Sequence, residues 1–331
     1  MSRFLLLIVL FGSSVTMTRS EPVLRARSES VGRLVALPVA LDPTGGARTV
    51  GALRFVSGWE LRSADPRFGG ISALALTREG FVALSDSGTV MWIGNARGRP
   101  SSLRLVPLAD GPGNSEKKAD RDSEAIAFDP AGRLWVTYER HNEVWRYSPE
   151  FRRGEAKRQP PEMRHWRPNS GAEAMARLPD GRFLIFSEGA GSVAQSSDLL
   201  LLDRDPTDPR AHADRMNYRL PEGFAVTDAA LLGGGRIMTL HRSFSVTGGV
   251  AASLGVAHLS EFRSGALVAP RIVATLRPPL TVDNMEALAI ERRGGKTYIW
   301  IASDDNFSTL QRTLLMQFAL DEKALTSPKR R

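Results

Sequence analysis

One pattern of about fifty residues recurs five times along this chain, and it leaves few architectures open. Each unit begins with a small or acidic residue and an alanine-rich run. A turn and a second apolar run follow, and the unit ends on a polar residue. The units begin at Ser72, Glu124, Glu173, Asp228 and Glu286. A recurring period of this size is typical of repeat proteins, in which each unit is one supersecondary structure.

Short apolar runs separated by Gly, Pro and Asp turns predict β-strands within each unit. After the first two strands of each unit, third strands are predicted at 143–147, 198–203, 254–262 and 313–320. Weaker fourth strands are predicted at 163–167, 215–220 and 271–276. Four strands in each repeat predict an all-β fold, a single β-propeller, with a two-sheet sandwich as the alternative.

The number of blades and the closure of the ring depend on the N-terminal part of the chain. Five four-stranded repeats are visible, and residues 31–63 leave a sixth blade open. Segment 52–62 is predicted as an outer strand that closes the ring by completing the last blade. Segments 115–121 and 150–161 are rich in charged residues and are predicted as exposed loops.

The first residues have the layout of a secretory signal peptide. Arg3 precedes an apolar run at 4–11, which is too short to span a bilayer, and small residues follow. We predict a signal peptide at 1–20, an N-terminal extension at 21–50, one propeller domain at 51–322 and a basic tail at 323–331. Export to the periplasm or outside the cell follows, with no membrane span after signal removal. A retained anchor is the alternative.

Composition excludes several classes of chemistry. The chain has no cysteine, which excludes disulfides, thiolate metal sites and a cysteine nucleophile. It contains neither a G-x-S-x-G nucleophile motif nor a P-loop. The formal charge is +8, but the basic residues lack interleaved aromatic residues, so no nucleic-acid partner is expected. The oligomeric state is left open.

The repeat places polar residues at one edge of the predicted ring. In each unit the residue that opens the first strand and the residue that ends the second belong to one hairpin, so they lie roughly 5 Å apart. The first strand of a propeller blade lines the central channel, so the five hairpins point these residues at one mouth. The closing residues are Asp86, Glu139, Glu188, Arg242 and Asp304.

Convergent carboxylates predict a site for a hard divalent cation, Ca²⁺ first and then Mg²⁺ or Mn²⁺. The candidate ligands are Glu124, Glu139, Glu173, Glu188, Glu286 and Asp304. Further candidates at the same rim are Asp86, Asp228, Asn284 and Asp305. The alternatives are polar caps that bond loop backbone and a purely structural calcium site.

Several segments resemble the phytase-like domain family, whose bacterial members are named for an esterase-like activity of phytase. They are RDSEAIA at 121–127, GAEAMA at 171–176, DNMEALA at 283–289 and WIASDDNFSTLQRTLL at 300–315. The resemblance extends from about residue 54 to 320 and implies a β-propeller. It also implies a hydrolase that acts on an ester or phosphate ester.

The residues and the resemblance together predict a metal-assisted ester or phosphoester hydrolase acting on a small molecule. The candidate catalytic residues are Glu124, Glu173, Glu286, Arg140, Arg242 and Arg312. The carboxylates would bind the cation or accept a proton, and the arginines would neutralise phosphate charge. The alternative is a non-catalytic exported propeller that binds a small ligand, a glycan or a protein.

Overall fold

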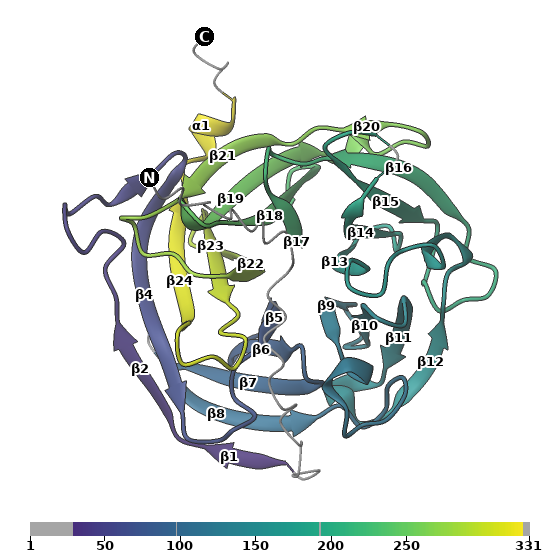
Figure 1. Ribbon diagram of the computed structural model, residues 1–331, viewed down its shortest axis with the longest axis horizontal. Coiled ribbons are helices and arrows are strands. Elements are labelled where there is room, and N and C mark those ends of the chain that lie inside the picture. The colour runs from purple at the N-terminus through teal and green to yellow at the C-terminus, as the bar shows by residue number, and fades with distance from the viewer. Residues whose placement is uncertain (1–28, 97, 192, 327–331) are drawn as a thin grey trace, which may run out of the picture.

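The computed structural model describes residues 29–96, 98–191 and 193–326, and it is a five-bladed β-propeller. Five small sheets stand in a ring around a central channel (Figure 1). The prediction of an all-β propeller is therefore confirmed. The predicted signal peptide at 1–20 and the end of the basic tail lie outside the described residues.

Each blade is an antiparallel sheet whose strands follow one another from the channel outward. Blade one contains β5 (Ile71–Leu76), β6 (Gly80–Ser85), β7 (Thr89–Ala96) and β8 (Arg99–Pro107). Blade two contains β9 (Ser123–Phe128), β10 (Leu134–Tyr138), β11 (Glu143–Tyr147) and β12 (Gly154–Arg158). Blade three contains β13 (Ala172–Arg177), β14 (Phe183–Ala190), β15 (Ser196–Leu202) and β16 (Ala213–Arg219), with β20 (Leu267–Val268) parallel to β16.

The last two blades differ in how they are completed. Blade four contains β17 (Ala225–Gly233), β18 (Arg236–Ser245), β19 (Gly249–His258) and β21 (Arg271–Leu276). Blade five contains β22 (Met285–Arg293), β23 (Lys296–Ser303) and β24 (Thr313–Leu320), followed outward by β4 (Leu53–Ser63) and β2 (Leu34–Pro38). The short strand β3 (Thr49–Val50) pairs with β4.

An N-terminal strand closes the ring, as the sequence predicts. Strand β4 runs antiparallel to β24, with Trp59 opposite Leu315 and Leu53 opposite Leu320. The last blade therefore combines both ends of the propeller (Figure 1). Strand β1 (Ser30–Gly32) pairs with β8 at the outer edge of blade one. Residues 31–63 thus extend existing blades, and the part of the chain that the structure describes forms five blades.

The outer part of blade two differs from the prediction. Segment 150–161, expected as a loop, contains the outer strand β12. Segment 163–167, expected as a strand, is instead a turn that follows a short 3-10 helix, Pro161–Met163. An edge strand has only one neighbour, so β12 (GEAKR) carries no apolar run. Met163 and Trp166 are apolar because both pack into the core between blades two and three.

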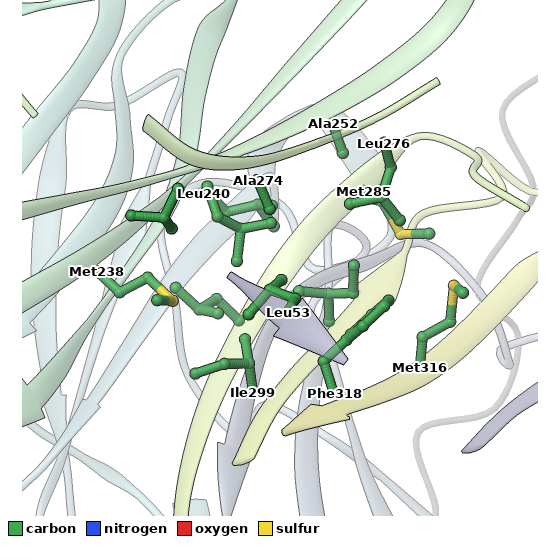
Figure 2. Close-up of a cluster of buried hydrophobic side chains, with 14 of the residues drawn as sticks. Leu53, Met238, Leu240, Ala252, Ala274, Leu276, Met285, Ile299, Met316 and Phe318 are labelled. Atoms are coloured by element: carbon green, nitrogen blue, oxygen red, sulfur yellow. The ribbon is translucent and has the colours of Figure 1, made fainter. Parts of the chain in front are cut away.

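The hydrophobic core is divided among the five interfaces between neighbouring blades. One cluster joins blades four and five and includes Leu240, Met285, Ile299 and Phe318 (Figure 2). Another joins blades five and one, where the rings of Trp59 and Trp300 stack with centroids 6.2 Å apart. Because each blade buries both faces, its strands read as nearly continuous apolar runs.

The inner strands are alanine-rich because five of them converge on a narrow channel. Ala73, Ala125, Ala174 and Ala287 are fully buried there, one in each of four blades. Helix is limited to short 3-10 turns, among them Lys118–Asp120, Pro149–Phe151 and Leu259–Glu261, and to α1 (Glu322–Thr326). In the described part of the chain no helix has the length and hydrophobicity needed to cross a membrane.

Candidate functional site

A β-bulge lies near the start of every inner strand, and in four of the five blades it turns one side chain toward the mouth of the channel. In blade three, Ala172 pairs with Ser187 and Ala174 pairs with Phe186, which leaves Glu173 as the extra residue. The same shift leaves Glu286 extra in blade five. The corresponding irregularities involve Ser72 in blade one and Glu124 in blade two. A bulge changes the direction of the side chain that it carries, so these residues do not follow the alternating up-and-down orientation of the other side chains in the strand.

The closing residue of each hairpin is held beside the opening residue by one recurring backbone hydrogen bond. The amide of Glu139 donates to the carbonyl of Asp122 at 2.9 Å, and the amide of Glu188 donates to that of Gly171 at 3.0 Å. In both cases the acceptor lies two residues before the opening residue. Asp86 and Asp304 make the equivalent bonds at 2.9 Å. The hairpin geometry inferred from the repeat is therefore present.

Blade four opens on Thr227 and not on Asp228, which corrects the alignment read from the sequence. Val226 pairs with His241 and Asp228 pairs with Leu240, so Thr227 is the bulged residue. Its hydroxyl donates to the carbonyl of Met285 in the next blade, as the Ser72 hydroxyl donates to Ser123. A shift of one residue reverses the side-chain direction in a strand.

As a consequence, Asp228 is a buried cap and does not line the cavity. Its carboxylate accepts the backbone N–H of Leu288 at 2.6 Å and that of Ala229 at 2.7 Å. Asp305, another rim candidate, accepts the N–H groups of Gly70 and Phe307. For these two residues the geometry is that of polar caps, the alternative that the sequence left open.

The remaining ring residues meet in one cavity of about 600 Å³ at the mouth of the channel. Seven carboxylates line it, together with Arg242, Ser72 and Asn284. The acids are Asp86, Glu124, Glu139, Glu173, Glu188, Glu286 and Asp304. All six predicted metal ligands are among them. The sequence placed these residues correctly because the repeat keeps the same hairpin register in every blade.

The predicted arginines occupy different positions. Arg242 lines the cavity, and its guanidinium lies 2.8 Å from both Glu188 and Glu286. Arg140 lies outside the lining, 3.4 Å from Asp122. Arg312 is also outside it, 3.5 Å from Asp283. Only Arg242 of the three is therefore placed to contact a molecule within the cavity.

Lys118 is a charged neighbour that the sequence reading assigned only to an exposed loop. Its ammonium lies 2.5 Å from Asp86 and 3.9 Å from Asp122. Burial opposes the charged form, but the two carboxylates outweigh burial and raise the pKa of Lys118. No repeat signal could reveal it, because the 3-10 turn that carries Lys118 occurs in one inter-blade loop.

The carboxyl groups of the ring are hard to ionise together. Burial raises the pKa values of Glu124, Glu173 and Asp304 well above the ordinary range, and neighbouring carboxylates add to the effect. Burial also raises the pKa of Glu139 to about 7. Several of these groups therefore hold protons near neutral pH unless a positive charge enters the cavity.

Three ring carboxyl groups have a cationic partner, because Lys118 pairs with Asp86 and Arg242 pairs with both Glu188 and Glu286. Burial raises the pKa of Asp86 to about 6, although Lys118 opposes the rise. Burial raises the pKa of Glu286 to about 7, and here Arg242 opposes it. In turn, the charge of Glu286 raises the pKa of Arg242, which stays a cation. Two cations therefore face seven ring carboxyls, so they can balance only part of the charge that the ring would carry if every carboxyl were ionised.

Two overlapping groups of oxygens fit a divalent cation. Asp122, Glu124 and Glu139 offer oxygens within 4.8 Å of one another, and so do Glu139, Glu173 and Glu188. Oxygens that bind Ca²⁺ at about 2.3–2.6 Å lie within such distances of each other. Oδ1 of Asp86 is buried with no hydrogen-bond donor in the described chain, which adds an unused acceptor. Glu139 belongs to both groups, so it is central to either site.

Residues outside the repeat pattern complete the cavity. Asn169, Asn306 and Gln311 add amide groups, and Phe244 and Val250 add an apolar wall. Phe244 is 71% exposed at the end of the β18–β19 hairpin. The sequence reading missed these residues because they lie in loops and extensions that differ from blade to blade.

Comparison with known proteins gives a family and distant structural similarities. A family model described as phytase-like, esterase-like activity of phytase, matches residues 66–307. No curated protein sequence matches the chain. A protein of unknown function from Bacteroides caccae is similar at 10% identity and TM-score 0.33, covering 67% of this chain and 63% of that one.

Two enzymes of known structure are also similar. The aldose sugar dehydrogenase from Streptomyces coelicolor is 11% identical with TM-score 0.43, covering 89% of this chain and 99% of that one. An exo-1,5-α-L-arabinanase from a bovine ruminal metagenomic library is 10% identical with TM-score 0.43, covering 76% and 93%. Similarities at this level do not indicate chemistry.

Proposed function

The chain belongs to the phytase-like family described by esterase-like activity of phytase, and from this premise we propose that it is a metal-assisted ester or phosphoester hydrolase. The observation that carries the proposal is the convergence of seven carboxylates on one open cavity. The residues at 1–20 have the pattern of a signal peptide, so we propose that it works in the periplasm or outside the cell.

The cation is proposed at the oxygens of Asp122, Glu124, Glu139, Glu173 and Glu188. A divalent ion bound there would polarise the ester oxygen and lower the pKa of a water molecule. Ca²⁺ fits an all-oxygen set, with Mg²⁺ and Mn²⁺ as the alternatives. The ion would also relieve the mutual repulsion of these carboxylates.

The other cavity residues would orient the substrate and move protons. Arg242, which contacts Glu188 of that oxygen set, would pair with phosphate oxygens in exchange for one of its two carboxylates. The pKa of Glu286 is raised to about 7 by burial, which suits a general base near neutral pH. Phe244 and Val250 would contact the organic part of the substrate. Arg140 and Arg312 would reach only a group that extends beyond the cavity.

Hydrolysis of p-nitrophenyl phosphate and p-nitrophenyl acetate, in EDTA and then with each cation, tests this proposal. We expect turnover with one cation and its loss in EDTA. Glu139→Gln should reduce kcat/KM at least 100-fold, because Glu139 is shared by both oxygen groups. Glu162→Gln, in the same blade but outside the cavity lining, is the matched control and should keep full activity. Full activity of Glu139→Gln in EDTA would contradict the proposal.

A non-catalytic binding function is the second candidate. It is favoured by the pairing of Arg242 and Lys118 with ring carboxylates, which an electrostatically balanced binding cavity would also need. In the same screen, a cation or ligand that raises the unfolding midpoint without any turnover would support this function over hydrolysis.

A further inference from the structure

A second cavity opens on the mouth side of blade one, beside the acidic cavity. Its volume is about 390 Å³, and its lining includes Ser87, Thr89, Ser115 and Arg121. The two cavities share a wall, because Asp86 lines the first and Ser87 the second. Likewise, Arg121 immediately precedes Asp122 of the acidic cluster. The second cavity therefore lies directly next to the proposed reaction site.

Arg121 is a buried cation that forms no ion pair with a carboxylate of the described residues. Its side chain lines the second cavity, and the residue is only 7% exposed. Its Nε and Nη1 atoms are buried and have no hydrogen-bond acceptor among the residues that the structure describes. An arginine removed from water is destabilising unless an anion or acceptors compensate it. An anion that enters this cavity would therefore be stabilised by Arg121.

The surrounding backbone is shaped to accommodate this side chain. A Cβ atom at Gly111 would overlap Nη1 of Arg121. A Cβ atom at Gly88, which has φ of +75°, would lie 3.0 Å from Cβ of Arg121. Two glycines on different loops thus leave room for the arginine. The backbone around Arg121 is therefore shaped to accept its side chain in this buried position.

The neighbouring groups do not neutralise Arg121. The hydroxyls of Tyr138 and Tyr147 bond each other at 2.6 Å, and that of Tyr147 donates to the carbonyl of Asp110. Arg121 also bonds the Tyr138 hydroxyl, but burial raises the pKa of Tyr138 to about 12, so this neighbour is neutral at neutral pH. In the lining, Arg67 is paired with Asp65 at 2.7 Å and Glu29 with Arg104 at 3.3 Å.

We propose that this second cavity is a binding site for a small oxyanion, namely phosphate or the phosphate group of a larger molecule. Arg121 supplies the positive charge, and the hydroxyls of Ser87, Thr89 and Ser115 are the polar groups available to the oxygens. The site is distinct from the acidic cavity and does not require the proposed hydrolysis to occur there.

Titration calorimetry of the full chain with sodium phosphate, in EDTA and at constant ionic strength, tests the site. EDTA removes any cation from the acidic cavity, so phosphate cannot bind there through a metal. We expect one phosphate per chain, and at least tenfold weaker binding for Arg121→Met. Arg152→Met is the matched control because Arg152 is an exposed arginine outside this lining. It should bind phosphate like the unmodified protein.

A second variant and a second ligand complete the test. Gly111→Ala keeps the arginine but displaces its guanidinium, so it should also weaken phosphate binding at least tenfold. If phenyl phosphate binds more tightly than inorganic phosphate, the natural ligand is the phosphate group of a larger molecule. If it binds equally or more weakly, the natural ligand is the free phosphate ion. Phosphate binding that is absent in the unmodified protein, or unchanged in both Arg121→Met and Gly111→Ala, would overturn the proposal.

Discussion

At the scale of single residues, a one-residue difference in register decides whether an acid faces the cavity or becomes a structural cap. Thr227 occupies the bulge in blade four, where Glu173 and Glu286 stand in blades three and five. Asp228, one position later, points to the neighbouring inner strand and accepts two backbone N–H groups. The acid that the sequence assigned to the rim therefore connects blades four and five.

Replacing Asp228 by alanine should destabilise the protein without weakening cation binding. Each buried N–H group that loses its acceptor costs roughly 1–3 kcal/mol. Urea unfolding of Asp228→Ala measures the loss, and Asp228→Asn, which keeps one acceptor oxygen, should lose less. Cation titration of the folded variant should match that of the unmodified protein. A tenfold loss of cation affinity would instead show that Asp228 contributes to the cation site.

At the scale of elements, ring closure depends on β4, a strand far in sequence from its partner β24. Trp59 of β4 is 8% exposed and packs against Trp300 in the cluster that joins blades five and one. Val56, on the same strand, is 41% exposed. One strand thus carries both a core position and a surface position, which allows closure to be tested.

Trp59→Ala should cost about 3–5 kcal/mol of unfolding free energy, as expected for removing a large buried aromatic side chain. Val56→Ala should change stability by no more than about 0.5 kcal/mol, because that side chain is at the surface. Denaturant unfolding of both variants measures the difference. Equal stability of the two variants would show that β4 does not hold the ring closed.

At the scale of the whole molecule, a protein with a formal charge of +8 gathers seven carboxylates at one mouth of its channel. The basic residues are spread along the chain, whereas the acids are brought together by five-fold repetition of one hairpin. Burial then raises the pKa of Glu139 and of Glu286 to about 7. The folded protein therefore binds protons that the unfolded chain releases.

This difference predicts a stability that falls as pH rises when no cation is present. In the unfolded chain these two glutamates titrate near the ordinary glutamate pKa of 4.5, and in the folded protein near 7. Because the folded state binds more protons, the unfolding free energy is highest below about pH 4.5 for these groups and decreases up to about pH 7.

Thermal unfolding in EDTA from pH 5 to pH 8 should therefore show a decreasing midpoint from this contribution. Added Ca²⁺ should raise the midpoint more at pH 8 than at pH 5, since a cation competes with protons for the same oxygens. A cation effect that is independent of pH would place the ion away from these carboxylates.

The sequence by itself determined the propeller, the hairpin in each blade, the closing strand at 52–62 and the mouth on which the closing acids meet. These properties depend on local hydrophobic period and on strand pairing between neighbours in the chain, which residue types record directly. Only the tertiary structure decided which carboxylates meet across blades, as Glu139 meets Glu173 and Glu188. It also decided that Thr227 replaces Asp228, that β12 is a strand, that Lys118 pairs with Asp86 and that Arg121 lines a separate cavity. The packing of the blades around the ring determines where the bulges lie, which strands form the edges and which loops touch. A local sequence pattern does not contain that information.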